Sequence, residues 1–531
     1  MLDAIALELE RKGVYNAKER LEGAIKKVIA SSILLGVLAF VTGYYIVLVL
    51  IPLFAIMFIY GLFTTGRDYG LINRETVLFA LHGFILANAG FDVTGIFDQF
   101  AKMREYEGSY IFRKIMGYFY FMGMDLREAI NRVLQEEKKL GVSFKSFLTS
   151  IYNGMTTGID TKGIFSMVIQ QEIIDSERNI EVFEQFINSF LSGLMPFIIM
   201  TPLMLVLLGG VANMPFIEYL FVNLALGVGV GLILLFSENK FLYYPEQIMF
   251  NGKLFLVQLL VAVLVSVAGY MVIGSYSMFL GVLAFFIVGY LGTREYIGLR
   301  KDTYTFLPVF LADLGGRISI GQTFTEAVTS MPLEIYGKFA KVLKFSLGNL
   351  VNIGEIPPKK DFERIYVYKI YKKLITDLQR GIYGYEALLN VRTIISLMST
   401  VYEKIRGTLS MNSFLMAVSL SFSTLFVDLM AFLGQKVSQS MAEVQHAGAQ
   451  IATGMQGMLM LLSFLRAKGW IVDVYFLFAV MFILIFGIFT SSVSDGTRHG
   501  NVQSIVYAIV SMVLIVTIHS VISPLLFAMY R

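Results

Sequence analysis

Hydrophobic and polar residues follow one another along this chain in long blocks, and one junction between two blocks organises the rest. From Gln170 to Glu184, apolar residues recur at helical spacing with charged residues between them, which predicts an amphipathic helix packed on a soluble core. After Glu184 no Asp, Glu, Lys or Arg occurs until Glu218. Because a run of about 20 such residues is enough to cross a bilayer, the pattern predicts a helix that leaves a soluble domain and enters a membrane.

The other apolar blocks predict further membrane crossings. Residues 29–63 are continuously uncharged for 35 residues, which as one helix would reach about 52 Å across a hydrocarbon core of roughly 30 Å. A hairpin that turns near Thr42 and Gly43 fits this length better. With the later apolar segments, the pattern predicts about nine crossings; those segments lie near residues 190–212, 216–236, 254–273, 275–293, 412–434, 471–492 and 505–528.

Between these segments lie two charged stretches with helical periodicity and frequent glycine breaks, which predict two helical bundles. The expected fold is therefore an all-α polytopic membrane protein with two cytoplasmic helical-bundle domains. Its expected parts are an amphipathic N-terminal segment (1–27), a membrane hairpin (28–63), a first domain (66–189), four membrane helices (190–293), a second domain (294–411), a membrane helix (412–434), an extracytoplasmic insert (435–470) and two last membrane helices (471–531).

The distribution of basic residues orients this arrangement. Cytoplasmic loops of membrane proteins carry an excess of Lys and Arg. With the N-terminus in the cytoplasm, 39 of the 43 Lys and Arg residues fall on the cytoplasmic side, including Lys240, Lys253 and Arg498 in short loops. We therefore expect a multi-pass protein of the cytoplasmic membrane with a cytoplasmic N-terminus.

Composition removes several chemistries from consideration. The chain has no cysteine and only four scattered histidines, so neither disulfides nor thiolate metal sites are expected, and no cofactor or metal is predicted. No GxxxxGK[ST] phosphate loop, HExxH motif or GxSxG motif occurs. The sequence thus predicts a protein that is not an enzyme.

The blocks repeat. The hairpin that starts at Ile29 reappears at Leu254, and the domain-to-membrane junction at Phe190 recurs near Leu415, both at offsets close to 225 residues. A small-residue turn at 87–90 has an expected counterpart at 312–316. Because each unit would cross the membrane four times, the two copies would share one orientation, which is a parallel internal repeat.

Several of these motifs resemble the F-domain family, the platform proteins of type IV pilus and type II secretion systems. Leu86-Ala87-Asn88-Ala89-Gly90-Phe91-Asp92-Val93 resembles the helix-turn-helix opening of that family, and 310–328 looks like a second copy. Residues 123–130 resemble its second helix pair, matched more loosely by 381–388, and the exit helix that ends at Met195-Pro196 resembles its passage into the membrane. The arrangement is most similar to archaeal members that assemble archaella or adhesive pili.

The resemblance implies a membrane platform that couples a cytoplasmic hexameric ATPase to the assembly of pilin-like subunits. It implies partners of three kinds: that ATPase, pilin or archaellin-like subunits, and membrane lipids. A homodimer is the expected oligomer, and no nucleic acid is expected. Because the platforms of this family have no catalytic residues, none is transferred to this chain.

A basic segment in the second domain is the candidate docking site for the ATPase. The first domain has 13 basic and 16 acidic residues, whereas the second has 17 basic and 11 acidic. The excess is densest in one segment, which could expose a basic face beside tyrosines: Lys359, Lys360, Arg364, Lys369, Lys372 and Lys373. A solvated face attracted to anionic lipid is the alternative interpretation.

Four further residues are candidates within the membrane. Asp428 and His519 are ionisable groups in apolar segments, where such groups are costly and so point to function. Asp428 could instead lie near the outer end, solvated or paired, and His519 could form a hydrogen bond to a neighbouring helix in place of acting as a proton relay. Pro196 and Pro202 are expected to kink the third membrane helix. The rival functions are a secondary transporter with cytoplasmic regulatory domains and a signalling scaffold.

Overall fold

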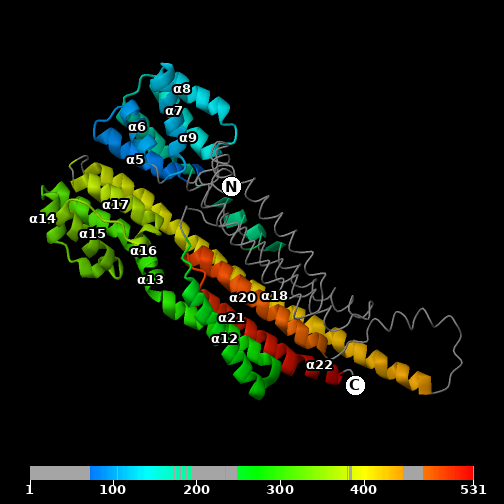
Figure 1. Ribbon diagram of the computed structural model, residues 1–531. Helices are drawn as coiled ribbons and strands as arrows, with labels where there is room; N and C mark the ends of the chain where they lie inside the picture. Colours follow the sequence, from blue (N-terminus) through cyan, green and yellow to red (C-terminus); the bar gives the residue numbers. More distant parts are fainter. Residues whose placement is uncertain are drawn as a thin grey trace, which may run out of the picture. The chain divides into compact units, whose positions relative to one another are not determined.

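The structure is a computed structural model, shown in Figure 1, and it describes the chain from residue 72 onward with gaps. The described residues are 72–73, 75–103, 106–172, 248–379, 381, 385–446 and 470–529, with Leu234 and single residues between 174 and 193. Within these ranges the fold is all-α, as the sequence predicted, and no strand occurs. The chain divides into two compact units, residues 1–169 and 170–531.

The first unit is a bundle of short helices around an aromatic core. Its helices are α5 (Thr76–Asn88), α6 (Val93–Lys102), α7 (Ser109–Met122), α8 (Leu126–Glu136) and α9 (Val142–Thr156), and residues 161–172 are again helical. The ring of Phe79 on α5 lies 4.9 Å from that of Phe112 and 5.2 Å from that of Phe100. The ring of Phe144 on α9 lies 6.0 Å from that of Phe79. Edge-to-face rings add to the free energy gained by burying their area, so this cluster holds four helices together.

Local signals explain where these helices begin and end. The side chain of Asp92 accepts a hydrogen bond from the Gly95 amide at 3.0 Å and so caps α6. Gly90 and Gly123 adopt left-handed conformations at the turns after α5 and α7. The buried carboxylate of Glu75 accepts the amides of Glu107 and Gly108, which ties the turn before α7 to the start of α5.

The second unit begins with an apolar hairpin. Helix α12 (Gly252–Ile273) turns through η2 (Gly274–Tyr276) into α13 (Ser277–Ser319), and α12 packs against α13. The predicted crossings at 254–273 and 275–293 correspond to α12 and the first half of α13. Helix α13 passes through the domain boundary expected at residue 294 and continues without a break for about seven more turns into the second domain.

The second domain contains short helices between two long ones. They are α14 (Phe324–Thr329), η3 (Leu333–Tyr336), α15 (Phe339–Ile353), α16 (Lys360–Glu363) and α17 (Tyr366–Gln379). The chain then leaves the domain through α18 (Tyr385–His446), a single helix of 62 residues. The boundaries predicted at 411 and 434 therefore fall inside one continuous helix, and the first part of the expected insert extends that helix to residue 446.

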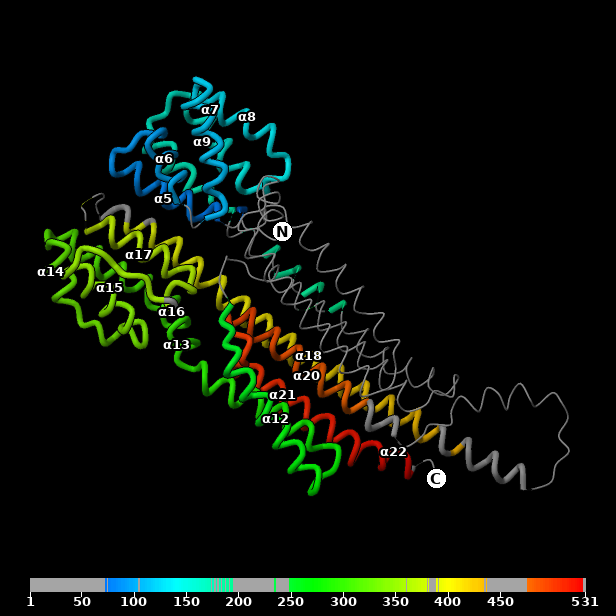
Figure 2. The backbone as a smooth tube through the Cα atoms, viewed as in Figure 1, coloured from blue at the N-terminus to red at the C-terminus, as the bar shows by residue number. Residues whose placement is uncertain are grey.

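Two further helices complete an apolar bundle, whose path is traced in Figure 2. They are α20 (Trp470–Asp495) and α21 (Val502–Thr517), which continues through a π-helical turn, η5 (Ile518–Ile522), into α22 (Ser523–Met529). Helices α13, α18, α20 and α21 all contact one another. Large rings on α20 fill the space between them, with Phe486 5.9 Å from Phe482 and 5.3 Å from Tyr507.

Four helical segments in the described part are long and apolar enough to cross a membrane: 252–319, 391–433, 475–495 and 502–528. They include the predicted crossings at 254–273, 275–293, 412–434, 471–492 and 505–528. The predicted hairpin at 28–63 lies outside the described residues, as do the crossings at 190–212 and 216–236 apart from a few single residues.

The two domains share one order of helices and turns. In the first, left-handed glycines follow α5, α7 and α9 at Gly90, Gly123 and Gly158. In the second, they follow α13, α15 and α17 at Gly321, Gly354 and Gly381. In this order Gly123 corresponds to Gly354, and Gly158 corresponds to Gly381. Residues 312–316, the predicted counterpart of the 87–90 turn, are helical, and the turn that corresponds to it lies at Gly321.

Equivalent positions of the two exit helices also touch. The side-chain amide of Asn412 donates to the side-chain oxygen of Asn188 at 2.9 Å, and the hydroxyl of Thr408 donates to the carboxylate of Glu184 at 3.1 Å. Both pairs are separated by 224 residues, which is close to the repeat offset in the sequence. Two helices that contact each other at equivalent positions run parallel and in register. The two exit helices therefore pack side by side in this way at residues 184–188 and 408–412.

Candidate functional site

The predicted docking segment folds into α16 and α17, where several of its cations already have partners. The amine of Lys372 lies 2.7 Å from Glu363, and that of Lys373 lies 3.2 Å from the buried carboxylate of Asp377. The amine of Lys359 lies over two aromatic rings, 4.5 Å from that of Phe362 and 5.1 Å from that of Phe345. These three residues therefore help to hold the second domain together.

The tyrosines of this segment are core residues. Tyr366, Tyr368 and Tyr371 are all buried, and the ring of Tyr371 packs edge-to-face on Phe310 and Phe339. Burial raises the pKa of Tyr368 to about 12. These rings form the apolar side of α17, whereas Lys369, Lys372 and Lys373 lie on its partly exposed side.

Two predicted cations remain available on the surface. Arg364 and Lys369 are partly exposed and make no ion pair with a residue that the structure describes. The side chain of Lys360 lies outside the described part of the chain, and so do Pro196 and Pro202. Of the predicted docking set, Arg364 and Lys369 are thus the residues that a partner could contact at least cost to the fold.

A buried polar cluster, which the sequence did not single out, lies at the junction between the apolar bundle and the second domain. Its centre is Asp495, at the end of α20. The carboxylate of Asp495 accepts the hydroxyl of Tyr402 at 2.9 Å and the side-chain amide of Asn501 at 2.5 Å. Asn501 also donates to the hydroxyl of Ser494 at 2.7 Å and caps α21 through Ser504. A buried charge is tolerated at such a site because it is fully hydrogen-bonded.

Arg300 joins the second domain to this cluster. It extends from α13 and donates to the Ser494 carbonyl at 2.7 Å, although only 4% of its surface is exposed. Its guanidinium lies 4.9 Å from the ring centre of Tyr402, and that ring stacks on Tyr304 at 5.0 Å. Through these contacts the two long helices α13 and α18 are fastened to the end of α20.

His499 forms the other half of the cluster. Its Nε2 accepts the amide of Asn251 at 2.7 Å, so Nδ1 carries the proton and donates to Gln258 Oε1 at 2.7 Å. Gln258 in turn donates to the carbonyls of Phe285 and His499. Burial lowers the pKa of His499 to about 4. A second proton on Nε2 would also break the bond with Asn251.

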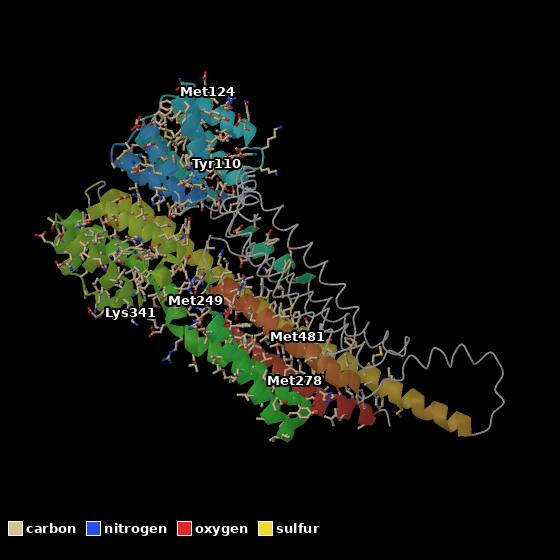
Figure 3. All side chains as sticks on the ribbon, viewed as in Figure 1. Tyr110, Met124, Met249, Met278, Lys341 and Met481 are labelled. Atoms are coloured by element: carbon tan, nitrogen blue, oxygen red, sulfur yellow. The ribbon has the colours of Figure 1, made fainter. Side chains whose placement is uncertain are left out.

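A short backbone bridge completes the junction. Met249, labelled in Figure 3, pairs with Thr497, and its amide donates to the Gly496 carbonyl at 2.6 Å. The side chain of Gln503 on α21 donates to the Arg406 carbonyl on α18 at 2.9 Å. We call the residues Arg300, Tyr402, Asp495, His499 and Asn501 the junction cluster. The sequence signal for it is the polar stretch 491–501 between two apolar segments, which was interpreted only as a cytoplasmic loop.

The two ionisable residues predicted within the membrane are in direct contact. His519 Nδ1 lies 2.8 Å from Asp428 Oδ1, and the hydroxyl of Ser523 donates to Asp428 Oδ2 at 2.7 Å. Asp428 is 5% exposed, whereas 29% of the His519 side chain is exposed. His519 is therefore bonded to a neighbouring helix, as one interpretation of the sequence predicted, and its partner is the buried acid.

This pair lies at a break in the helix and is surrounded by aromatic rings. His519 belongs to η5, and π-turns of this kind often occur at functional sites. Its ring lies 5.0 Å from that of Phe476 and 6.0 Å from that of Tyr276. Tyr276 and Arg300 are 24 residues apart on one continuous stretch of helix, about 36 Å at 1.5 Å per residue. The junction cluster and the Asp428 pair therefore lie at opposite ends of the apolar bundle, separated by about one bilayer thickness.

Protein-family models, curated proteins and solved structures give no match to this chain. Within the described residues, no group of His, Asp and Glu side chains is placed to hold a metal ion.

Proposed function

We propose that this chain is the platform protein of an archaeal type IV filament machine, an archaellum or an adhesive pilus, and that it couples a cytoplasmic hexameric ATPase to the assembly of pilin-like subunits. The observation that supports this most is the continuity of α13 and α18. Both helices are part of the apolar bundle and also form the two sides of the second domain. Such a helix transmits a displacement at one end to the other.

The junction cluster suits this role. If α13 and α18 were held only by apolar packing, they could slide past α20 with little change in contact area. Directional bonds from Arg300 and Tyr402 to the end of α20 oppose such sliding, because each displaced bond would leave a buried polar group without a partner. A push on the second domain would then move the bundle as one body.

Charge favours the second domain as the part that contacts the ATPase. The second domain carries the excess of Lys and Arg. In the proposed orientation this chain lies in the cell membrane, and its second domain faces the cytoplasm. An acidic patch on the ATPase would supply the complementary charge, which gives fast encounter and correct register. Among the six predicted residues, Arg364 and Lys369 are best placed for this contact.

The test is the double variant Arg364→Glu/Lys369→Glu, with co-purification of the ATPase encoded in the same genome as the readout. We expect binding to fall about tenfold at low salt, since each reversed rim charge removes attraction and adds repulsion. The matched control is Lys301→Glu/Lys404→Glu, which reverses two exposed lysines that make no ion pair with a residue that the structure describes. Lys372 and Lys373 are left unchanged, because reversing either would face its acidic partner with a like charge.

Unchanged ATPase binding by the double variant at low and high salt would place the docking face elsewhere and leave the platform proposal without its contact. The purified chain alone should hydrolyse no nucleotide, because it lacks a phosphate loop. The rival function, a secondary transporter, has one observation in its favour, the Asp428 and His519 pair. Substrate flux through proteoliposomes without any ATPase would favour that rival.

A further inference from the structure

We propose that Asp428 and His519 form a proton-binding site, and that occupation of this site by a proton tightens the packing of the C-terminal helix α22 on α18. The site takes a single proton from water and needs no other ligand. This inference is independent of the filament platform, since it depends only on contacts inside the apolar bundle.

The hydrogen bonds define where the proton binds. An ionised Asp428 accepts from both His519 and Ser523, so His519 Nδ1 carries a hydrogen and Nε2 is the atom that can take another. With His519 neutral, the pair leaves one negative charge in an apolar surrounding. When Nε2 is protonated, the pair becomes an imidazolium with a carboxylate, which carries no net charge and has a stronger, charge-assisted bond.

The partly exposed His519 ring gives the proton a path, while Asp428 is shielded. The titratable groups around the pair come from each neighbouring helix. They are Tyr276 from the turn between α12 and α13, Tyr475 near the start of α20, and Lys436 two turns further along α18, whose amine lies 5.8 Å from the ring centre of Phe432. Asp473 belongs to the first turn of α20, and its side chain lies outside the described part of the chain.

The pair is placed to control α22. Ser523, the first residue of α22, bonds to the same carboxylate that His519 holds. One helical turn beyond each partner, the rings of Phe432 on α18 and Phe527 on α22 stack at 4.2 Å with an angle of 2° between their planes. A stronger bond between His519 and Asp428 would hold the π-turn against α18 and thereby hold this contact closed.

Cysteine cross-linking tests the proposal without interference, because the native chain has no cysteine. The reporter is Phe432→Cys/Phe527→Cys in the full-length protein in liposomes. The matched control is Gly315→Cys/Leu388→Cys, which joins α13 to α18 at a site where the added Cβ atom would lie 3.7 Å from the Leu388 Cβ, a distance that suits a disulfide. Both pairs are oxidised for the same time at pH 5 to 8, and the reporter yield is divided by the control yield to cancel the pH dependence of thiol reactivity.

We expect this ratio to rise at least threefold between pH 8 and pH 5. Adding His519→Gln to the reporter should abolish the rise, because glutamine can still bond to Asp428 but takes no proton in this range. Asp473→Asn should leave the rise in place. A ratio in the otherwise native reporter that does not change with pH would overturn the proposal, and so would a full pH response in the His519→Gln protein.

Discussion

At the scale of single residues, the buried charges of the apolar bundle lie at its two ends in the described part of the chain. Asp495 and Arg300 lie at one end and Asp428 at the other, and each is held by hydrogen bonds or ring contacts to other elements of the bundle. A buried charge costs several kcal/mol unless it is paired, so these positions tolerate little change. Their partners are as important as the charges themselves.

His499 should make the stability of the junction cluster depend on pH. Its folded-state pKa of about 4 lies below the ordinary value of 6.5, so the unfolded chain binds more protons between these values. The contribution of His499 is complete above pH 6.5 and is lost as pH falls towards 4, by up to about 1.4 kcal/mol per pH unit. Thermal unfolding in detergent between pH 4 and 7 measures this loss.

The control is His499→Gln, which keeps hydrogen-bonding groups but does not titrate. We expect its melting temperature to fall less steeply below pH 6.5 than that of the native protein. Parallel profiles for the two proteins would show that the acid sensitivity arises from other groups.

At the scale of elements, α7 in the first domain and α15 in the second domain each end at a glycine with a left-handed backbone conformation. Gly123 follows α7 with φ +64°, and Gly354 follows α15 with φ +80°. Six residues before each lies a glycine inside the helix, Gly117 or Gly348, and an added Cβ would meet nothing within 4 Å at any of the four positions. The four glycines thus separate the backbone requirement from any effect of packing.

We expect Gly123→Ala and Gly354→Ala each to destabilise the protein by about 1 kcal/mol, because an L side chain is strained at positive φ. The matched changes Gly117→Ala and Gly348→Ala should stabilise it by about 0.5–1 kcal/mol, since alanine is the better helix former. Denaturant or thermal unfolding of the four variants gives the comparison. Equal effects at the two kinds of position would contradict the requirement for a left-handed backbone, and unequal effects of Gly123→Ala and Gly354→Ala would contradict the equivalence of the two helix ends.

At the scale of the whole chain, the repeats are joined through equivalent positions of their exit helices. A polar pair such as Asn188 and Asn412 in a parallel seam costs stability compared with apolar residues but fixes the register of the two helices. In this seam the two helices therefore contact each other as the helices of a parallel coiled coil do.

A double-mutant cycle tests this pairing. Asn412→Leu alone should destabilise the protein by about 1–2 kcal/mol, because an asparagine would then face leucine, and adding Asn188→Leu should recover about 1 kcal/mol of that loss. Asn349, which bonds to the Phe345 carbonyl in the second domain, supplies the control cycle with Asn188. In the control cycle the two changes in the free energy of unfolding should add. If they also add in the Asn188 and Asn412 cycle, the two asparagines do not interact and the proposed pairing of the exit helices is refuted.

The sequence by itself determined the class of the fold in the described part of the chain, because hydrophobic periodicity reports directly on helices and on the solvent of each face. It located α12, α20 and the start of α13 to within a few residues, it predicted a repeat, and it singled out Asp428 and His519 as costly. These are local properties, since each depends on residues that are close together in the chain.

Only the tertiary structure decided which distant residues meet. Asp428 and His519 are 91 residues apart, and Gln258 and His499 are 241 apart, so no pattern along the chain could show that each pair shares hydrogen bonds. The same limit applies to α17, whose lysines and tyrosines predicted a basic side and an apolar side but not how much of the basic side is exposed. Whether an amphipathic helix lies at the surface or at the centre of a domain depends on how many neighbours cover it, and that number is set by packing between elements, not by the helix itself.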